Sequence, residues 1–299
     1  MEKRICLSNA SELIRAGELV GFPTETVYGL GANALDPAAV EKIYAAKGRP
    51  GTSPLIVHVS SIEMAQSLVR DWPERAEQLA RVFWPGPLTL VLPKQPHVPD
   101  RVTAGLDTVG VRMPAHPIAL ELIREAGVPI AGPSANLFGG ISPTSAQHVR
   151  DALGGRVAMV LDGGSSNVGI ESTVLSLAAP NPVLLRPGMV TREEIEAVIG
   201  PVQLLGTSAE GAHSSPGLHR RHYSPKTPLV LVEGGKLPTI GRGMFIPMPA
   251  DPREYAAVLY ERLHDADTQG WDWIALEQPP ETEEWSAIRD RLERASYLS

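Results

Sequence analysis

Short apolar runs alternate with amphipathic segments along the first 200 residues of the chain. A run of four or five apolar residues is typical of a buried strand, and the segments between these runs have a helical period. The pattern therefore predicts an α/β domain. Its strands are predicted at 19–22, 55–59, 88–92, 109–113, 128–131, 157–161, 173–177 and 183–185, and its helices at 8–16, 74–82, 117–125 and 145–153.

Two further helices are predicted from their capping residues. Asp36 followed by Pro37 is typical of an N-cap and a first helical residue, and Gly48 follows the basic end of the same segment. Thr191 with Glu194 three residues later forms a capping box, which predicts a helix that runs to residue 199.

The character of the chain changes after residue 200. Residues 206–227 are rich in small, polar and basic residues, which predicts a linker. Beyond it we predict a second unit with strands at 229–232, 243–246 and 273–275 and helices at 253–265 and 283–295. The predicted organisation is a domain at 1–205, a linker at 206–227 and a domain at 228–299. A unit of about 70 residues has a small core, so we expect it to lean on the first domain.

Composition and charge narrow the class of protein. The 299 residues carry 34 acidic and 27 basic side chains, and this net charge of −7 argues against a nonspecific nucleic-acid binder. Residues 226–299 hold 13 acidic and 8 basic side chains, so the rest of the chain is nearly neutral. Cys6 is the one cysteine, which excludes an intrachain disulfide. We find neither a signal-peptide pattern nor an apolar run of membrane-spanning length, so we expect a cytoplasmic protein that binds no membrane.

Several familiar catalytic motifs are missing from the sequence. It contains no G-x-x-x-x-G-K-[ST] loop and no G-x-G-x-x-G after a strand, so any nucleotide must bind by another device. Residues 132–136, Gly-Pro-Ser-Ala-Asn, lack the closing glycine of a nucleophile elbow. The lack of cysteine and Ser-His-Asp patterns argues against covalent catalysis.

Three motifs could carry chemistry or could be structural. Residues 21–31 form a loop rich in glycine and hydroxyl groups, suited to a polar ligand or to a turn. Lys47 and Arg49 suit a polyanion, but they could also neutralise a helix dipole. Arg112 alternates with apolar residues along a strand, so it needs either a protein carboxylate or a substrate carboxylate. His58 on another strand is more commonly a core histidine.

Further clusters of hydroxyl groups, glycine and arginine follow other predicted strands, at 131–136, 142–144, 162–174 and 184–188. Each cluster is weak evidence alone. Because they all fall at strand ends, together they predict one polar pocket for an anionic ligand.

These motifs, taken in order, resemble those of the YrdC family of L-threonylcarbamoyladenylate synthases. The resemblance rests on FPTETVYGLGANA, KGRP with PLIVHV, FWPGPLTLVL, VTAGLDTVGVRMPAHPIA, PIAGPSAN, DGG with ESTV, and VLLRPG, between residue 8 and about residue 200. The segment SPGLHRRHYSPKTPL resembles the linker of the family's longer, two-domain form. The implied fold is a twisted, open α/β sheet with helices and a large concave face, plus a small C-terminal α/β accessory domain.

The resemblance also implies an activity and partners. ATP, L-threonine and bicarbonate would give threonylcarbamoyl-AMP, pyrophosphate and water, with Mg²⁺ accompanying ATP. Whether bicarbonate or dissolved CO2 is the carbon donor is left open. A downstream threonylcarbamoyl-transferase complex would then modify tRNA next to the anticodon, so this chain would contact tRNA indirectly or weakly. The ligands of the metal are left open, because Mg²⁺ is often held by phosphates and water.

The site residues implied by the resemblance fall into three groups. Those implied for threonine are Thr26, His58, Arg112 and Ser172. Those implied for ATP are Lys47, Arg49, Ser53, Thr108, Ser134, Asn136, Ser142 and Arg186. His222 and Tyr223 of the linker, next to Arg220 and Arg221, would help close the pocket as a lid.

Two departures and two alternatives stand beside this interpretation. Ser53 occupies a position where other members often have asparagine, and the C-terminal unit is shorter, notably across 233–254. A carbamoyltransferase that handles carbamoyl-adenylate would share some motifs, although such chains are longer and carry metal motifs. A module that binds double-stranded RNA is disfavoured by the charge and would not explain Arg112 within an apolar strand.

Overall fold

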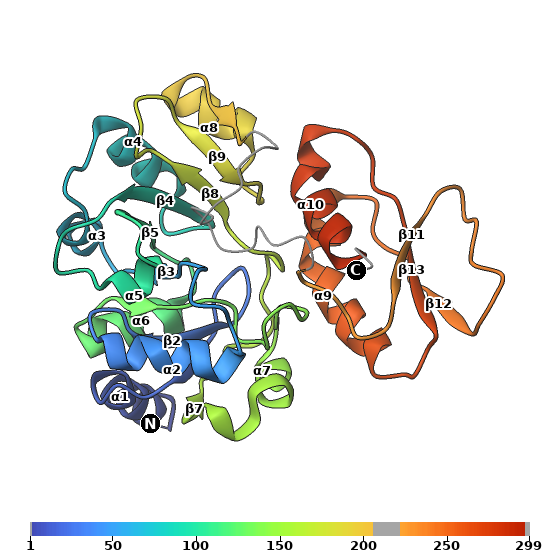
Figure 1. Cartoon of the computed structure of the whole chain (residues 1–299), viewed down its shortest axis with the longest axis horizontal. Coiled ribbons are helices and arrows are strands. Elements are labelled where there is room, and N and C mark those ends of the chain that lie inside the picture. Colours follow the sequence, from blue (N-terminus) through green and yellow to red (C-terminus); the bar gives the residue numbers. More distant parts are fainter. Residues whose placement is uncertain (1, 206–221, 297–299) are drawn as a thin grey trace.

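The computed structural model describes residues 2–205 and 222–296 of the chain. Within these ranges the chain forms a large unit on a ten-stranded sheet and a small unit on a three-stranded sheet (Figure 1). Most of the predicted linker, 206–221 with Arg220 and Arg221, lies outside the described residues.

The large sheet is mixed and open, as the predicted fold class requires. Its strands lie in the order β10-β9-β8-β4-β5-β3-β6-β2-β1-β7. Their bounds are β1 (Val20–Phe22), β2 (Gly29–Asn33), β3 (Ile56–His58), β4 (Leu88–Pro93), β5 (Thr108–Arg112), β6 (Ile130–Ala131), β7 (Met159–Val160), β8 (Thr173–Ser176), β9 (Val183–Arg186) and β10 (Gln203–Leu204). The parallel pair β3 and β5 is in a register that sets His58 opposite Arg112.

The two helices predicted from their capping residues begin and end where expected, whereas the helix predicted at 8–16 begins earlier, at Glu2. The helices of the large unit are α1 (Glu2–Arg15), α2 (Pro37–Lys47), α3 (Ile62–Leu68), α4 (Glu74–Phe83), α5 (Asp100–Thr103), α6 (Pro117–Ala126), α7 (Ala146–Leu153) with the 3-10 turn η1 (Gly154–Arg156), and α8 (Arg192–Ile199). Asp36 accepts a hydrogen bond from the amide of Ala38, and Gly48 ends α2 in the left-handed conformation. Both hydrogen bonds of the Thr191 capping box are present, so these predictions are confirmed.

The predicted loop over residues 21–31 is wrong at its end, because β2 begins at Gly29. Its glycines permit this strand, since a Cβ on Gly29 would lie only 2.7 Å from the ring of Phe22 in the neighbouring β1. Glycine usually disfavours strands, and the sequence pattern therefore concealed this one. The strand β10 and the short helices α3 and α5 were also not predicted.

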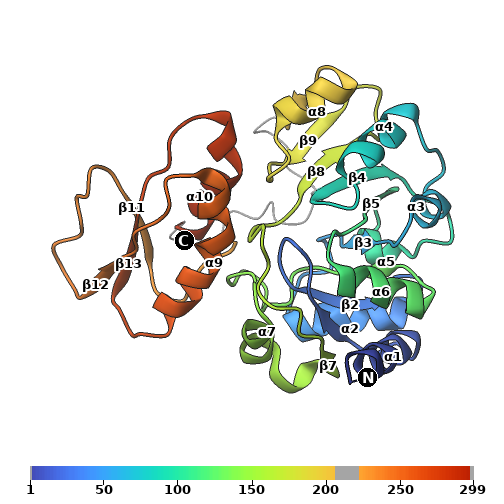
Figure 2. The ribbon, with the colours of Figure 1, turned by 180° about the vertical axis from the view of Figure 1, so that it is seen from behind.

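The small unit has a parallel sheet in the order β11-β13-β12. Its elements are β11 (Leu229–Val232), β12 (Gly243–Phe245), α9 (Pro252–Asp267), β13 (Trp273–Glu277), η2 (Glu283–Trp285) and α10 (Ser286–Ala295). Helices α9 and α10 lie between this sheet and the large unit, and the view from behind agrees (Figures 1 and 2).

One of the hydrophobic clusters contains residues of both units. The cluster built on α9, α10 and β13 includes Val27, Ile141 and Ile170 of the large unit. The prediction that the C-terminal unit leans on the first domain is therefore confirmed. Because the loops that carry these three residues also carry candidate site residues, the packing of the small unit fixes their position.

Gly169 lies where the backbones of the two units approach closely, and it gives a test of their packing. Its φ is +81°, and a Cβ would collide with the carbonyl oxygen of Ala256 in α9. Gly105 has nearly the same φ, +80°, but open space around it. We expect Gly169→Ala to lower the free energy of unfolding by about 2 kcal/mol more than Gly105→Ala, measured by urea unfolding. Equal losses in the two variants would show that the units are not packed this closely.

Candidate functional site

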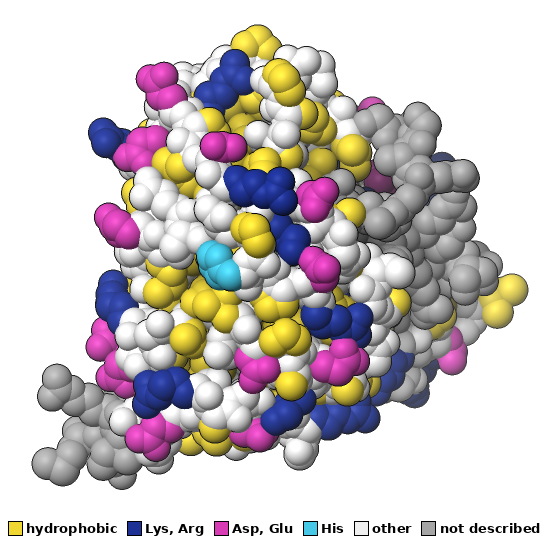
Figure 3. All heavy atoms as spheres, turned by 60° about the vertical axis from the view of Figure 1, so that its left-hand side comes forward, with side chains coloured by type: hydrophobic (Ala, Val, Ile, Leu, Met, Phe, Trp, Pro, Cys, Tyr) yellow, Lys and Arg dark blue, Asp and Glu magenta, His cyan; other side chains and the backbone are white. Residues whose placement is uncertain are grey.

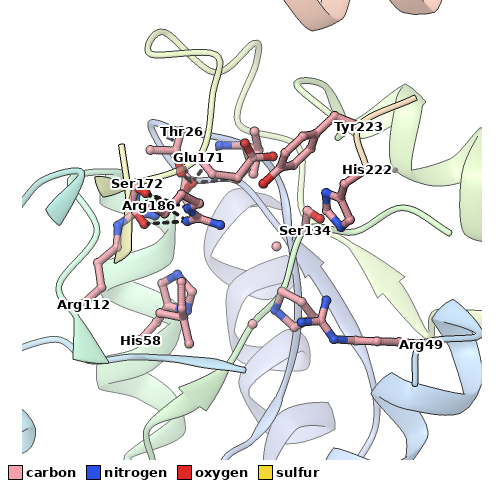
Figure 4. Close-up of a pocket in the computed structure, with 16 residues that line it drawn as sticks. Thr26, Arg49, His58, Arg112, Ser134, Glu171, Ser172, Arg186, His222 and Tyr223 are labelled. Atoms are coloured by element: carbon pink, nitrogen blue, oxygen red, sulfur yellow. Dashed lines mark hydrogen bonds between the residues drawn. The ribbon is translucent and has the colours of Figure 1, made fainter. Parts of the chain in front are cut away.

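A cavity opens where the strand ends of the large sheet face the small unit. Figure 4 shows cationic, hydroxyl and aromatic side chains pointing into it from both sides. The lining residues are Thr24, Thr26, Val27, Gly29, Arg49, Ile56, His58, Arg112, Gly132, Pro133, Ser134, Glu171, Ser172, Arg186, His222 and Tyr223.

Arg112 enters the cavity from the end of β5 and is buried. Its Nη2 donates to Oε1 of Glu25 at 2.6 Å, and its Nε donates to the carbonyl of Gly86 at 3.2 Å. The other carboxylate oxygen of Glu25 accepts from the amide of Ala115 at 3.0 Å. The anion that Arg112 needs is therefore a protein carboxylate in this structure. Among the described residues Nη1 donates no hydrogen bond, so one side of the fork faces the cavity.

His58 lies beside Arg112 at the end of the adjacent strand β3 (Figure 4). Burial, and then the charge of Arg112, lower the pKa of His58 to about 3. The imidazole is therefore neutral near pH 7. Its Nδ1 has no hydrogen-bond partner in the described part of the chain, and a Cβ on Gly132 would lie only 3.0 Å from it. A neutral ring with an unused nitrogen can hydrogen-bond a ligand.

Arg49 and Lys47 leave the end of α2 on either side of Gly48. Arg49 lines the cavity, and its Nη2 donates to Oγ of Ser53 at 2.5 Å and to the carbonyl of Pro54 at 3.0 Å. Burial lowers the pKa of Arg49 to about 10, which leaves it charged near pH 7. The ammonium of Lys47 does not line the cavity, because it donates to the carbonyls of Ser134 and Asn136 at 2.5 Å each.

Arg186 reaches the cavity from the end of β9. Its Nε and Nη2 donate to the carbonyl of Ser172 at 3.1 and 2.9 Å, and Nη2 also approaches the hydroxyl of Ser172 at 3.3 Å. That hydroxyl lies 2.8 Å from the hydroxyl of Thr89. The contacts fix Ser172 and direct one face of Arg186 toward the cavity (Figure 4).

Glu171 connects the cavity to the small unit. Its Oε1 accepts from Oγ of Ser142 at 2.5 Å, and its Oε2 accepts from the hydroxyl of Tyr260 at 3.1 Å and from Nε of Arg291 at 2.9 Å. Burial raises the pKa of Tyr260, and the charge of Glu171 raises it further, so the tyrosine keeps its proton and donates.

His222 and Tyr223 cover the side of the cavity nearest the small unit (Figure 4). Tyr223 is fully buried in a left-handed conformation, with φ of 62°. Its ring packs edge-on against His222 at 4.1 Å. The amide of His222 donates to the carbonyl of Arg294, and that of Ser224 donates to the carbonyl of Gly139. Both units therefore hold this segment in place.

The structure brings nine of the residues expected from the sequence to one cavity. They are Thr26, Arg49, His58, Arg112, Ser134, Ser172, Arg186, His222 and Tyr223. The other five do not line it. Lys47, Ser53 and Ser142 bond to lining residues or to their backbone, Thr108 lines a neighbouring cavity beside Ile56, and Asn136 donates to the carbonyls of Leu137 and Gly140.

Sequence reasoning missed Glu25, Glu171 and Arg291. Glu25 and Glu171 stand within motifs that were singled out, directly before Thr26 and Ser172. An acidic residue in a motif otherwise rich in hydroxyl groups was the available signal. Arg291 lies in a charged helix without a local feature that distinguishes it from its neighbours.

The fold and the lining define a mixed α/β protein with a buried cavity lined by arginine and hydroxyl side chains. Comparison with known families places the chain further. Residues 12–188 match the family model for Sua5, YciO and YrdC, which carries the description "telomere recombination". Residues 190–296 match the model described as the C-terminal domain of threonylcarbamoyl-AMP synthase. The chain belongs to the Sua5–YciO–YrdC family, in its form with a C-terminal domain.

Relatives match along nearly the whole chain. The threonylcarbamoyl-AMP synthase of Bacillus subtilis is 46% identical and the match covers 97% of this chain and 92% of that protein. The enzyme of the same name from Pyrococcus abyssi is also 46% identical, covering 96% of this chain and 93% of that protein. A crystal structure of P. abyssi Sua5 complexed with L-threonine has a TM-score of 0.90 and 44% identity, covering 97% of this chain and 94% of that one.

The pKa of His58 gives a test of the cavity. Because its folded pKa is about 3 against an ordinary 6.5, the unfolded chain binds the proton first as pH falls. We expect the contribution of His58 to the free energy of unfolding to be independent of pH above pH 6.5. Between pH 6.5 and about 3 the free energy of unfolding should decrease, less steeply in His58→Gln than in the unmodified chain. In NMR spectra the ring resonances of His58 should not titrate between pH 5 and 8. A titration midpoint near 6.5 would show that the ring is solvated.

Proposed function

We propose that the protein is a nucleotidyltransferase that forms threonylcarbamoyl-AMP from ATP, L-threonine and bicarbonate or CO2. Pyrophosphate is released, together with water when bicarbonate is the donor. The observation that carries the proposal is the pair His58 and Arg112, which presents a neutral imidazole and an open guanidinium side by side in a buried cavity. Family membership and near full-length similarity to enzymes of this name support the substrates.

Threonine would bind where Arg112 and His58 meet. The free Nη1 of Arg112 can donate to the threonine carboxylate while Nη2 keeps Glu25 neutralised. His58 can hydrogen-bond an amine or a hydroxyl without adding a second positive charge next to Arg112. The hydroxyls of Thr26 and Ser172 lie in the same part of the lining and provide further polar partners.

The nucleotide would bind in the same cavity, with Arg49, Ser134 and Arg186 of its lining as partners. The planar, multiply donating guanidinium groups of the two arginines suit the phosphates of ATP. Three further residues expected for ATP would act by holding lining residues or their backbone in position. Lys47 fixes the 134–136 backbone, Ser53 fixes Arg49, and Ser142 is held by Glu171.

This lining suits a reaction without a covalent enzyme intermediate. The amine of threonine attacks the carbon of bicarbonate or CO2 and forms a carbamate, with loss of water when bicarbonate is the donor. A carbamate oxygen then attacks the α-phosphorus of ATP in line, and the bond to pyrophosphate breaks. The cavity contributes by positioning the reactants and neutralising their charge. Burial beneath His222 and Tyr223 would protect the adenylate from water.

Mg²⁺ would enter with ATP as part of the substrate. In residues 2–205 and 222–296 there is no group of three or more histidine, cysteine or acidic side chains placed to hold a metal ion. The carboxylates nearest the site, Glu25 and Glu171, are each paired with an arginine. Phosphate oxygens and water would therefore supply most of the ligands.

The product would be passed to a threonylcarbamoyl-transferase complex that modifies tRNA in the cytoplasm. In Figure 3, lysine and arginine side chains are interspersed with acidic ones across the displayed face of the large unit. Mixed charge of this kind favours weak or indirect contact with tRNA over a broad binding surface. In the described residues no helix is long and apolar enough to cross a membrane.

The activity has a direct test. ATP, L-threonine and bicarbonate together should release pyrophosphate and give threonylcarbamoyl-AMP, detected by mass spectrometry. Omitting threonine should abolish the release, because without the carbamate there is no nucleophile for the α-phosphorus. Pyrophosphate release at the same rate without threonine would refute the proposed reaction.

The role of Arg112 is tested in a variant in which residue 25 carries no charge. Removing Arg112 alone would leave Glu25 buried and unpaired, which destabilises the fold. We therefore compare Glu25→Gln with Glu25→Gln/Arg112→Gln. The second change should raise the KM for threonine by about tenfold or more and that for ATP by less than about threefold. Equal increases in the two KM values would indicate a structural role for Arg112.

A further inference from the structure

The small unit contributes one side chain that reaches the wall of the cavity. Arg291 of α10 is completely buried, with 0% of its surface exposed. Its Nε donates to Oε2 of Glu171 at 2.9 Å, and its Nη2 donates to the carbonyl of Glu171 at 3.2 Å. Arg291 does not line the cavity itself, so it lies behind Glu171 and acts on the site through that residue.

Glu171 is an unusual neighbour for an anionic ligand. Its side chain lines the cavity and is only 7% exposed, and Ser142, which it holds at 2.5 Å, is among the residues expected for the nucleotide. A carboxylate in a poorly solvated wall repels phosphate more strongly than one in water. Its negative charge must be compensated before a polyanion can bind next to it.

Among the described side chains that bond to the carboxylate of Glu171, Arg291 supplies the positive charge. Ser142 and Tyr260 donate neutral hydrogen bonds, whereas Arg291 makes an ion pair at 2.9 Å. The guanidinium also contacts Asp290, at 2.8 Å, and lies 5.3 Å from the ring centre of Tyr223. Asp290 in turn is bonded to Arg294 at 2.9 Å, so the second acidic group has a cation of its own.

We propose that Arg291 is a positioning residue of the proposed synthase, which neutralises and orients Glu171 so that the phosphates of ATP can bind in the cavity. The C-terminal unit is therefore part of the nucleotide site and not only a cover for it. This inference rests on the proposed function for the identity of the anion. It goes beyond that function in assigning part of the affinity for ATP to a residue that touches no substrate.

The test measures binding of a nonhydrolysable ATP analogue in the full chain by equilibrium dialysis, without threonine. Arg291→Met removes the charge at similar volume and should weaken binding by about tenfold or more. Arg289→Met is the matched control, since it makes the same change on the same helix at a partly exposed position. The control should change binding by less than about twofold.

Suppression separates charge compensation from a structural role. If Arg291 acts by neutralising Glu171, then Glu171→Gln in the Arg291→Met background should restore most of the lost ATP affinity. Threonine binding, measured in the same variants, should stay within about threefold of that of the unmodified chain. A purely structural role predicts that the double variant binds ATP no better than Arg291→Met, or that affinity for both substrates falls together. Either result overturns the inference.

A second variant keeps the inference testable if Arg291→Met does not fold. Arg291→Lys keeps the positive charge but loses the two-pronged geometry. It should fold and retain ATP affinity within about threefold, whereas a tenfold loss in a folded Arg291→Lys protein contradicts charge compensation. An unmodified chain that binds the analogue but makes no adenylate would refute the proposed function alone. One that binds no analogue would refute both.

Discussion

Several cations are buried around one cavity, and the compensation of their charge determines how the surrounding loops are arranged. Moving an unpaired charge from water into a protein interior is strongly unfavourable, so each cation needs nearby acceptors. Arg112 and Arg291 are paired with Glu25 and Glu171. Lys47, Arg49 and Arg186 are satisfied mainly by backbone carbonyls of the loops next to them. These hydrogen bonds hold the loops in place while Arg49, Arg112 and Arg186 remain in the lining of the cavity.

The same constraint explains why the two units are joined so closely. The carboxylate of Glu171 is satisfied by Ser142 from the large unit and by Tyr260 and Arg291 from the small unit. The hydrophobic core that spans the units stabilises this arrangement, since burial of apolar surface holds α9 and α10 against the loops that bear the site. A domain that looks accessory in sequence is thereby connected to the wall of the cavity.

The sequence predicted the α/β class, most strands and the gathering of arginines and hydroxyl groups at strand ends, because these follow from local patterns. β2 was missed because its glycines are explained only by the ring of Phe22 in the neighbouring strand. Whether the anion beside Arg112 was a protein carboxylate stayed open, since Glu25 is 87 residues away in sequence. The pairing of Arg291 with Glu171 spans 120 residues and has no local signal. Long-range contacts of this kind decide which candidate side chains face the cavity and which support it.

In the proposed reaction, one cavity holds threonine close to the α-phosphate of ATP. No covalent nucleophile of the protein takes part. A crystal structure of this chain with L-threonine and a nonhydrolysable ATP analogue tests this arrangement most directly. We expect the threonine carboxylate on Nη1 of Arg112, its amine turned toward the α-phosphate, and the phosphates in contact with Arg49 or Arg186. Threonine bound away from Arg112, or with its amine directed away from the α-phosphate, would refute this arrangement of the substrates.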